Sequence, residues 1–306
     1  METAMMNVNE KADIHFEFEE LVKKNIILSK FISVYEDKMK SSIFQRFDFY
    51  ANLINYFAYL FHISDSRLLN DLSFATYFYY KGISEIDDVF DNKKQPKNIY
   101  LLNYFTSVTF INEALFRFRS IFSGDNNFWE DIENLKKEFY EAQLLELSLK
   151  SENIEYTKTV YEELILKKNI LVLSPIFALA YLADDFSLFP IIKDSILLFH
   201  QGMQIFDDVF DFKLDVENNH LTYQHILVKK FMQKNNLLIK DNPEQLYKYF
   251  HFSGTSLNSL KDAKQKIHES LILVNDLSVE GYKKELISRE NKLTETIIFF
   301  ENRLNK

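Results

Sequence analysis

Apolar residues recur at helical spacing along most of this 306-residue chain. Apolar positions at i, i+3, i+4 and i+7 are typical of amphipathic helices that bury one face. The predicted helices cover residues 16–39, 42–61, 67–91, 98–122, 128–150, 156–183, 190–215, 223–233, 243–252, 256–276 and 279–306, with a turn at 217–220. We therefore expect an all-α fold built from long helices.

Composition supports this expectation. The chain has only five glycines and four prolines, which leaves few turn signals for a sheet-based fold. Its hydrophobic content of 47% is enough for a large core. Residues 1–12 have the character of a flexible N-terminal tail, and no later stretch is long enough to be a linker between domains. We expect a single all-α domain over residues 13–306.

Charge and cysteine usage narrow the functional classes. The formal net charge of −9 disfavours nucleic acid as a partner, because phosphate-binding surfaces are normally basic. The absence of cysteine excludes disulfides and thiolate chemistry. The N-terminus lacks the basic and apolar regions of a secretory signal, so we expect a cytoplasmic protein. The most apolar stretch, 170–183, is too short to span a membrane, contains Pro175 and is predicted to be a core helix.

The five-residue sequence DDVFD occurs twice, at 87–91 and at 207–211. In each acidic motif the outer aspartates are four residues apart, so a helix presents both carboxylates on one face. Asp215, four residues after Asp211, adds a third carboxylate to that face of the second motif. Acidic runs are often solvated surfaces, but both copies have strongly apolar neighbours, such as Ile86, Val89 and Phe206. Oxygen ligands of this kind suit Mg²⁺, which binds carboxylates together with substrate phosphates. We therefore expect a metal-assisted diphosphate site.

Aromatic residues are plentiful before both acidic motifs, in a chain with 30 Phe and 17 Tyr. Most of these rings are expected to pack the core. Ring faces also stabilise passing positive charge without acting as nucleophiles, which suits an isoprenoid chain and its carbocations. The predicted pocket residues are Phe78, Tyr79, Ile83, Gln143 and Phe206. The histidines near the second motif are predicted to cap or pack rather than to bind metal.

These segments resemble the class I isoprenoid enzymes, which include trans-prenyl diphosphate synthases, squalene and phytoene synthases and class I terpene cyclases. The run QIFDDVFD, in which Gln204 precedes the aspartates, is similar to the second aspartate-rich motif of prenyl synthases. Other matches are the Gln-x-x-Asp-Leu segment at Gln143 and Glu146, the Lys-Thr-x-x-Leu lysine at Lys167, and the Thr-Tyr pair at Thr222 and Tyr223. The resemblance covers about residues 46–223.

Two departures favour a reaction with one diphosphate substrate. The basic segments that hold isopentenyl diphosphate in the elongation enzymes correspond here to KSSIFQRFDF and NKKQPKN, in which Arg46 is one remaining basic contact. The spacing of Asp207, Asp211 and Asp215, with Asp208 at i+1, resembles the Asn, Ser and Glu metal-binding triad of class I terpene cyclases.

The resemblance implies a class I terpenoid synthase bundle around a central cavity, with three Mg²⁺ ions. The implied metal ligands are Asp87, Asp88, Asp91, Asp207, Asp211 and Asp215; the catalytic acids are Asp87, Asp88, Asp207 and Asp208; and the diphosphate-binding residues are Lys167, Arg46, Lys213 and Gln204. The favoured activity is that of a terpene synthase, which ionises an allylic prenyl diphosphate and then cyclises or rearranges it. A trans-prenyltransferase and a catalytically silent helical partner subunit are the alternatives. Members of this family often dimerise, so a homodimer is one possible assembly.

Overall fold

The computed structural model describes residues 19–91, 96–151, 156–218, 220, 222–237 and 242–304. Within these ranges the side chains of 34–48, 51, 87, 88, 90, 91, 150, 151, 303 and 304 lie outside the description. The described residues form helices joined by turns and short loops, and they contain no strand. The all-α prediction is therefore confirmed.

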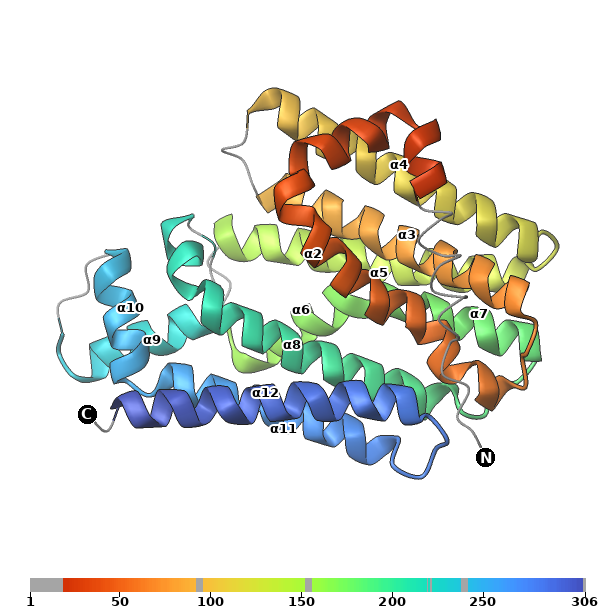
Figure 1. Cartoon of the computed structure of the whole chain (residues 1–306). Helices are drawn as coiled ribbons and strands as arrows, with labels where there is room; N and C mark the ends of the chain where they lie inside the picture. The colour runs from red at the N-terminus through yellow and green to blue at the C-terminus, as the bar shows by residue number, and fades with distance from the viewer. Residues whose placement is uncertain are drawn as a thin grey trace. The chain divides into compact units, whose positions relative to one another are not determined.

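The helices follow one another closely along the chain (Figure 1). They are α2 (Ile26–Phe57), η1 (Ala58–Phe61), α3 (Ser66–Asp91), α4 (Lys97–Ile121), α5 (Asn126–Ser151), α6 (Lys158–Asn169), η2 (Ile170–Leu173), α7 (Ser174–Ala183), α8 (Phe189–Glu217), α9 (Tyr223–Lys234), α10 (Pro243–Phe252), α11 (Thr255–Leu273) and α12 (Glu280–Leu304). They form two compact units. Unit 1 holds the described residues up to Ile132, Val172–Phe189 and Ser278–Gly281, and unit 2 holds Glu133–Leu171, Pro190–Leu277 and the described residues from Tyr282 onward. Whether the chain is a single domain stays a prediction.

Unit 1 holds the helix that ends in the first acidic motif. In this unit α3 packs along α4, and the two helices approach closely at Gly82 (Figure 1). A Cβ atom at Gly82 would lie 2.6 Å from the Ile111 side chain and 3.0 Å from the Ser107 carbonyl oxygen. The Ser107 hydroxyl donates to the Gly82 carbonyl over 2.6 Å. Glycine at this position therefore sets how closely α3 and α4 can pack.

The N-terminal helices differ from the sequence-based expectation. The predicted break at residues 40–41 is absent, and α2 runs without interruption from Ile26 to Phe57. The chain breaks earlier, at Asn25, whose side chain accepts hydrogen bonds from the backbone N–H groups of Ile27 and Leu28. Asparagine is a preferred N-cap because its side-chain oxygen satisfies N–H groups that have no partner within the helix. This cap signal was missed because the apolar pattern continues through it.

The predicted helix at 156–183 is three elements rather than one. Helix α6 gives way to the 3₁₀ helix η2, and α7 begins at Ser174 with Pro175 in its first turn. Proline is tolerated there because the first helical N–H groups need no partner within the helix. By length and composition the stretch Lys158–Ala183 could cross a membrane, but 67% of its apolar window is buried in the structure. Burial of this extent is typical of core helices, as predicted.

Unit 2 carries the second acidic motif on α8, which packs against α11. At Gly202 a Cβ atom would lie 2.7 Å from the Ile267 side chain and 2.8 Å from the Ala263 carbonyl oxygen. The hydroxyl groups of Ser195 and Ser270 each donate to the other residue's carbonyl oxygen. Figure 1 shows α11 and α12 running along α8. This close contact gives the helix that bears Asp207–Asp215 a rigid support.

Candidate functional site: a polar network beside the second acidic motif

The first acidic motif lies at the C-terminal end of α3. The backbone of Asp87–Asp91 is helical, but the side chains of Asp87, Asp88 and Asp91 are outside the described residues, as is that of Arg46 on α2. Two residues before the motif, Glu85 is buried and pairs with Lys81. The roles predicted for these three aspartates and for Arg46 therefore stay predictions.

The second acidic motif divides between two faces of α8. Asp207 and Asp211 are exposed, Asp215 is half-buried, and Asp208 is only 7% exposed. Asp208 and Asp215 are seven residues apart, which is nearly two full turns, so they project within about 20° of each other. Asp207 is turned about 80° from Asp215 by the same arithmetic. The second aspartate of the motif, rather than the first, shares the inner face with Asp215.

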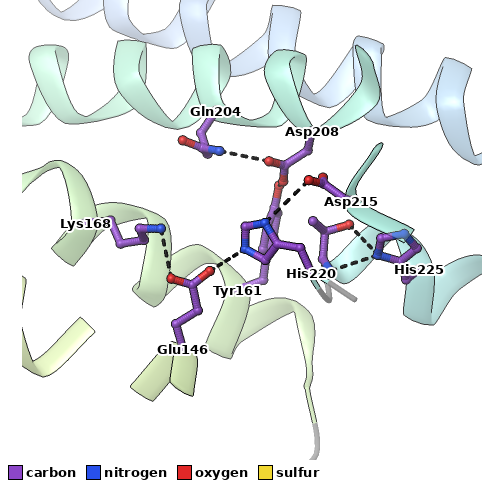
Figure 2. A network of polar contacts seen from close by, with 9 residues as sticks. Glu146, Tyr161, Lys168, Gln204, Asp208, Asp215, His220 and His225 are labelled. Carbon is purple, nitrogen blue, oxygen red and sulfur yellow. Dashed lines mark hydrogen bonds and ion pairs between the residues drawn. The ribbon is translucent and has the colours of Figure 1, made fainter. Parts of the chain in front are cut away.

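Neutral hydrogen-bond donors surround the buried carboxylate of Asp208 (Figure 2). The Tyr161 hydroxyl on α6 donates to Oδ2 over 2.5 Å, and Gln204 Nε2, one turn earlier on α8, donates to Oδ1 over 2.9 Å. The hydroxyl of Tyr161 in turn accepts from Gln224 Nε2 on α9, over 3.1 Å. Three helices thus hold one carboxylate in a defined orientation.

Burial raises the pKa of Asp208 to about 6. The hydrogen bonds from Tyr161 and Gln204 oppose this shift, and the negative charge of Asp215 adds to it. Burial, together with the neighbouring Asp208 charge, also raises the pKa of Tyr161 well above its usual value. Tyr161 is therefore a neutral donor at physiological pH. The carboxyl group of Asp208 gains or loses its proton at about pH 6.

A second set of contacts centres on Glu146 of α5 (Figure 2). Its Oε2 accepts from Lys168 Nζ over 3.0 Å, and its Oε1 lies 2.6 Å from His220 Nε2. The other ring nitrogen of His220, Nδ1, lies 3.4 Å from Asp215 Oδ1. His220 therefore bridges the acid of the Gln-x-x-Asp-Leu-like segment and the last acid of the second motif.

His225 secures the start of α9, immediately after this bridge. Its Nδ1 accepts the backbone N–H of Thr222 over 2.9 Å, which caps the helix. Burial lowers the pKa of His225 to about 4, so its ring is neutral at physiological pH. The capping role expected for a histidine here fits His225. The bridging position of His220 was missed, because only the folded chain brings α5 and the end of α8 together.

The other predicted residues lie on α3, α5, α6 and α8. Lys167 pairs with Glu163 over 3.1 Å and with Glu141 over 3.6 Å, whereas its neighbour Lys168 contacts Glu146. Lys213 pairs with Glu244 at an exposed position. Of the predicted pocket residues, Phe78, Tyr79 and Ile83 are buried on α3 and Gln143 is half-buried on α5. Phe206 lies on α8, and its ring faces the ammonium group of Lys292 on α12. Their functional roles stay predictions.

The oxygen donors of the second motif fit a hard divalent cation. Asp207 and Asp211 lie four residues apart on the exposed face of α8, where their carboxylates are accessible to an ion and to a diphosphate. Within the described residues, however, no three acidic or histidine side chains are gathered as a metal site. In proteins Mg²⁺ is usually held by one or two carboxylates together with water and substrate phosphate oxygens.

Comparison of the sequence with protein-family models and with curated proteins found no match. Comparison of the structure did find similar folds. A polyprenyl synthase from Caulobacter crescentus CB15, complexed with calcium and isoprenyl diphosphate, is 14% identical and superposes with a TM-score of 0.64 over 87% of this chain and 93% of its own. A geranylgeranyl pyrophosphate synthase, also 14% identical, superposes with a TM-score of 0.60 over 87% of this chain and 97% of its own. The described part of the chain therefore has the all-α fold of these two synthases.

Proposed function

We propose that this protein is a trans-prenyltransferase that extends an allylic prenyl diphosphate in the presence of Mg²⁺. The observation that carries the proposal is the extent of the fold similarity, since both similar structures are prenyl diphosphate synthases and are matched over nearly their whole length. The position of Gln204 and Asp208 in an ordered network supports it, because buried polar groups with specific partners are typical of functional sites.

In the proposed reaction the carbon–oxygen bond of the allylic diphosphate breaks, a new carbon–carbon bond forms to isopentenyl diphosphate, and a proton is lost. Mg²⁺ would be bound by Asp87, Asp88 and Asp91 at the first motif and by Asp207, Asp211 and Asp215 at the second, and would neutralise the departing diphosphate.

The side chains of the network have supporting roles in this proposal. Gln204 and Tyr161 hold Asp208 and thereby fix the rotation of α8. Lys168 adds positive charge beside Glu146, and of the two adjacent lysines it is the one inside the network. Its ammonium group is therefore a better candidate than that of Lys167 to favour diphosphate binding.

A terpene synthase is the second candidate, because the stretches KSSIFQRFDF and NKKQPKN lack most of the basic residues expected to hold isopentenyl diphosphate. Both candidates begin by ionising the same allylic diphosphate, so they differ in what captures the cation. We also propose that the protein uses Mg²⁺, that it forms a homodimer and that it is cytoplasmic.

The test is to incubate the purified full chain with Mg²⁺ and geranyl, farnesyl or geranylgeranyl diphosphate, with and without isopentenyl diphosphate. Longer diphosphates formed only when isopentenyl diphosphate is present would support the prenyltransferase. A hydrocarbon or terpene alcohol formed from one substrate alone would establish the terpene synthase instead. No turnover with any substrate would favour the silent partner subunit.

The same assay tests the second acidic motif. The double substitution Asp207→Asn, Asp211→Asn is expected to lower turnover at least about a hundredfold, because it removes charge that would hold the metal. Asp194→Asn, an exposed aspartate earlier on α8, is the matched control and should retain full activity. Equal activities in the two variants would exclude this motif from the reaction.

A further inference from the structure

His220 lies just after α8, and its own backbone ties it to the end of that helix. Its N–H group donates to the carbonyl oxygen of Asp215 over 2.7 Å. A hydrogen bond of this kind satisfies one of the last carbonyl groups of a helix and turns the chain back over the final turn. Figure 2 shows the result, in which the imidazole ring of His220 lies beside the carboxylate of Asp215.

The ring of His220 contacts an acid on each side. Nε2 lies 2.6 Å from Oε1 of Glu146, and Nδ1 lies 3.4 Å from Oδ1 of Asp215. The second oxygen of Glu146 accepts from Lys168 Nζ over 3.0 Å. The side chains of Glu146 and Asp215 are only 10% and 15% exposed, so these contacts are partly shielded from water. A continuous chain of polar contacts thus connects α6, α5 and the end of α8 within unit 2.

The contact with His220 involves one of the two carboxylate oxygens of Asp215. Because Oδ1 faces the ring, the carboxylate can bind a cation through Oδ2 at the same time. In metal sites, a group that holds a ligating carboxylate orients it, and loss of that group typically weakens metal binding by about tenfold to a hundredfold. His220 has this position relative to Asp215, which is one of the acids proposed to bind Mg²⁺.

We infer that His220 is a positioning residue, which fixes the carboxylate of Asp215 against Glu146 and thereby favours Mg²⁺-dependent binding of the diphosphate. The inference rests on the proposed function, because it takes Asp215 as a metal-binding acid. The ring acts through Asp215 and does not itself touch the diphosphate. Histidine suits this role because its two ring nitrogens face in different directions, so one side chain can join acids from two helices.

Two substitutions separate the two contacts of the ring. The amide nitrogen of asparagine can lie close to the position of Nδ1, and that of glutamine close to the position of Nε2. His220→Asn therefore keeps a donor beside Asp215, whereas His220→Gln keeps only the donor beside Glu146. His268→Gln is the matched control, because His268 is an exposed histidine of α11 whose Nδ1 lies 3.2 Å from Oε1 of Glu290.

The experiment is isothermal titration of the purified full chain with inorganic pyrophosphate at a fixed excess of Mg²⁺, and again with EDTA in place of Mg²⁺. His220→Gln should weaken the Mg²⁺-dependent binding at least about tenfold. His220→Asn should weaken it less, and His268→Gln should leave it unchanged. Unchanged binding by His220→Gln, or a larger loss for His220→Asn than for His220→Gln, would overturn the inference. No Mg²⁺-dependent binding by the unchanged protein would contradict the proposed function itself, and the inference with it.

A second comparison tests whether His220 acts through Asp215. In a protein that already carries Asp215→Ala, His220→Gln should cause no further loss of pyrophosphate binding, because the ring has no carboxylate left to orient. The same loss with and without Asp215→Ala would show that the ring contacts the diphosphate directly, and would overturn the positioning role. If His220→Gln does not fold, His220→Ala in the same two proteins gives the deciding comparison.

Discussion

Glu146 and Asp208 are buried carboxylates in the same unit, yet their surroundings differ in charge. Glu146 contacts the ammonium group of Lys168 and the imidazole of His220. Asp208 contacts only neutral donors among its described hydrogen bonds, those of Tyr161 and Gln204. Neutral donors orient a carboxylate but offset little of the free energy that burial of its charge costs. Similar burial therefore leaves these two acids with different electrostatic roles.

The largest expected effect is on the pH dependence of stability. Because the pKa of Asp208 is raised to about 6, the folded state holds its proton more tightly than the unfolded state does. The stability that this proton contributes is present at low pH and is lost as the pH rises through about 6. The difference between this pKa of about 6 and the ordinary value of an aspartate corresponds to about 3 kcal/mol of stability. Asp208→Asn has no such titration, so its stability relative to the unchanged protein should rise by that amount between pH 4 and pH 7.5.

Denaturant unfolding of both proteins with EDTA measures this difference. The buried histidines His200 and His225, with pKa values lowered to about 3 and about 4, act in the opposite direction and destabilise the fold as the pH falls. They are present in both proteins, so they largely cancel in the comparison. A stability difference that stays constant with pH would show that Asp208 is not protonated more readily in the fold.

A smaller effect is expected for the donor to Asp208. Tyr161→Phe removes the hydroxyl that donates to the carboxylate and should lower the free energy of unfolding by about 1–3 kcal/mol at pH 8. The loss should shrink at pH 5, where Asp208 is protonated. Tyr140→Phe, an exposed position on α5, should change stability by less than about 0.5 kcal/mol. Equal losses of unfolding free energy for Tyr161→Phe and Tyr140→Phe would show that the hydrogen bond to Asp208 does not stabilise the fold.

The smallest expected effect concerns the acid with a charged partner. Lys168→Met takes the ammonium group from a mostly buried pair and should cost about 1–2 kcal/mol, between the values typical of exposed and buried pairs. Lys167→Met, the adjacent position, removes more exposed pairs with Glu141 and Glu163 and should cost less than about 1 kcal/mol. Thermal unfolding measures the stability of both variants. A larger loss of stability for Lys167→Met than for Lys168→Met would show that Lys167 is the more important of the two lysines for the fold.

Helical periodicity and the scarcity of glycine and proline were sufficient to predict the fold class, and periodicity placed most of the helices. It placed α10 at 243–252 as observed and located α3, α4 and α5 to within a few residues. It failed where local hydrogen-bonding chemistry decides the boundary, at the Asn25 cap and at the 3₁₀ segment before Pro175. Apolar spacing records which face of a helix is buried, and that face can continue across a break in the backbone.

The individual elements of the candidate site were also readable from the sequence. The second acidic motif, Gln204, and the segments at Glu146 and Lys167–Lys168 each stand out by residue type and spacing. The tertiary structure alone decided that Asp208 is the buried aspartate, that Lys168 rather than Lys167 reaches Glu146, and that His220 lies between Glu146 and Asp215. The physical reason is that spacing along one helix determines which side chains share a face, whereas burial and partners depend on the helices packed against that face.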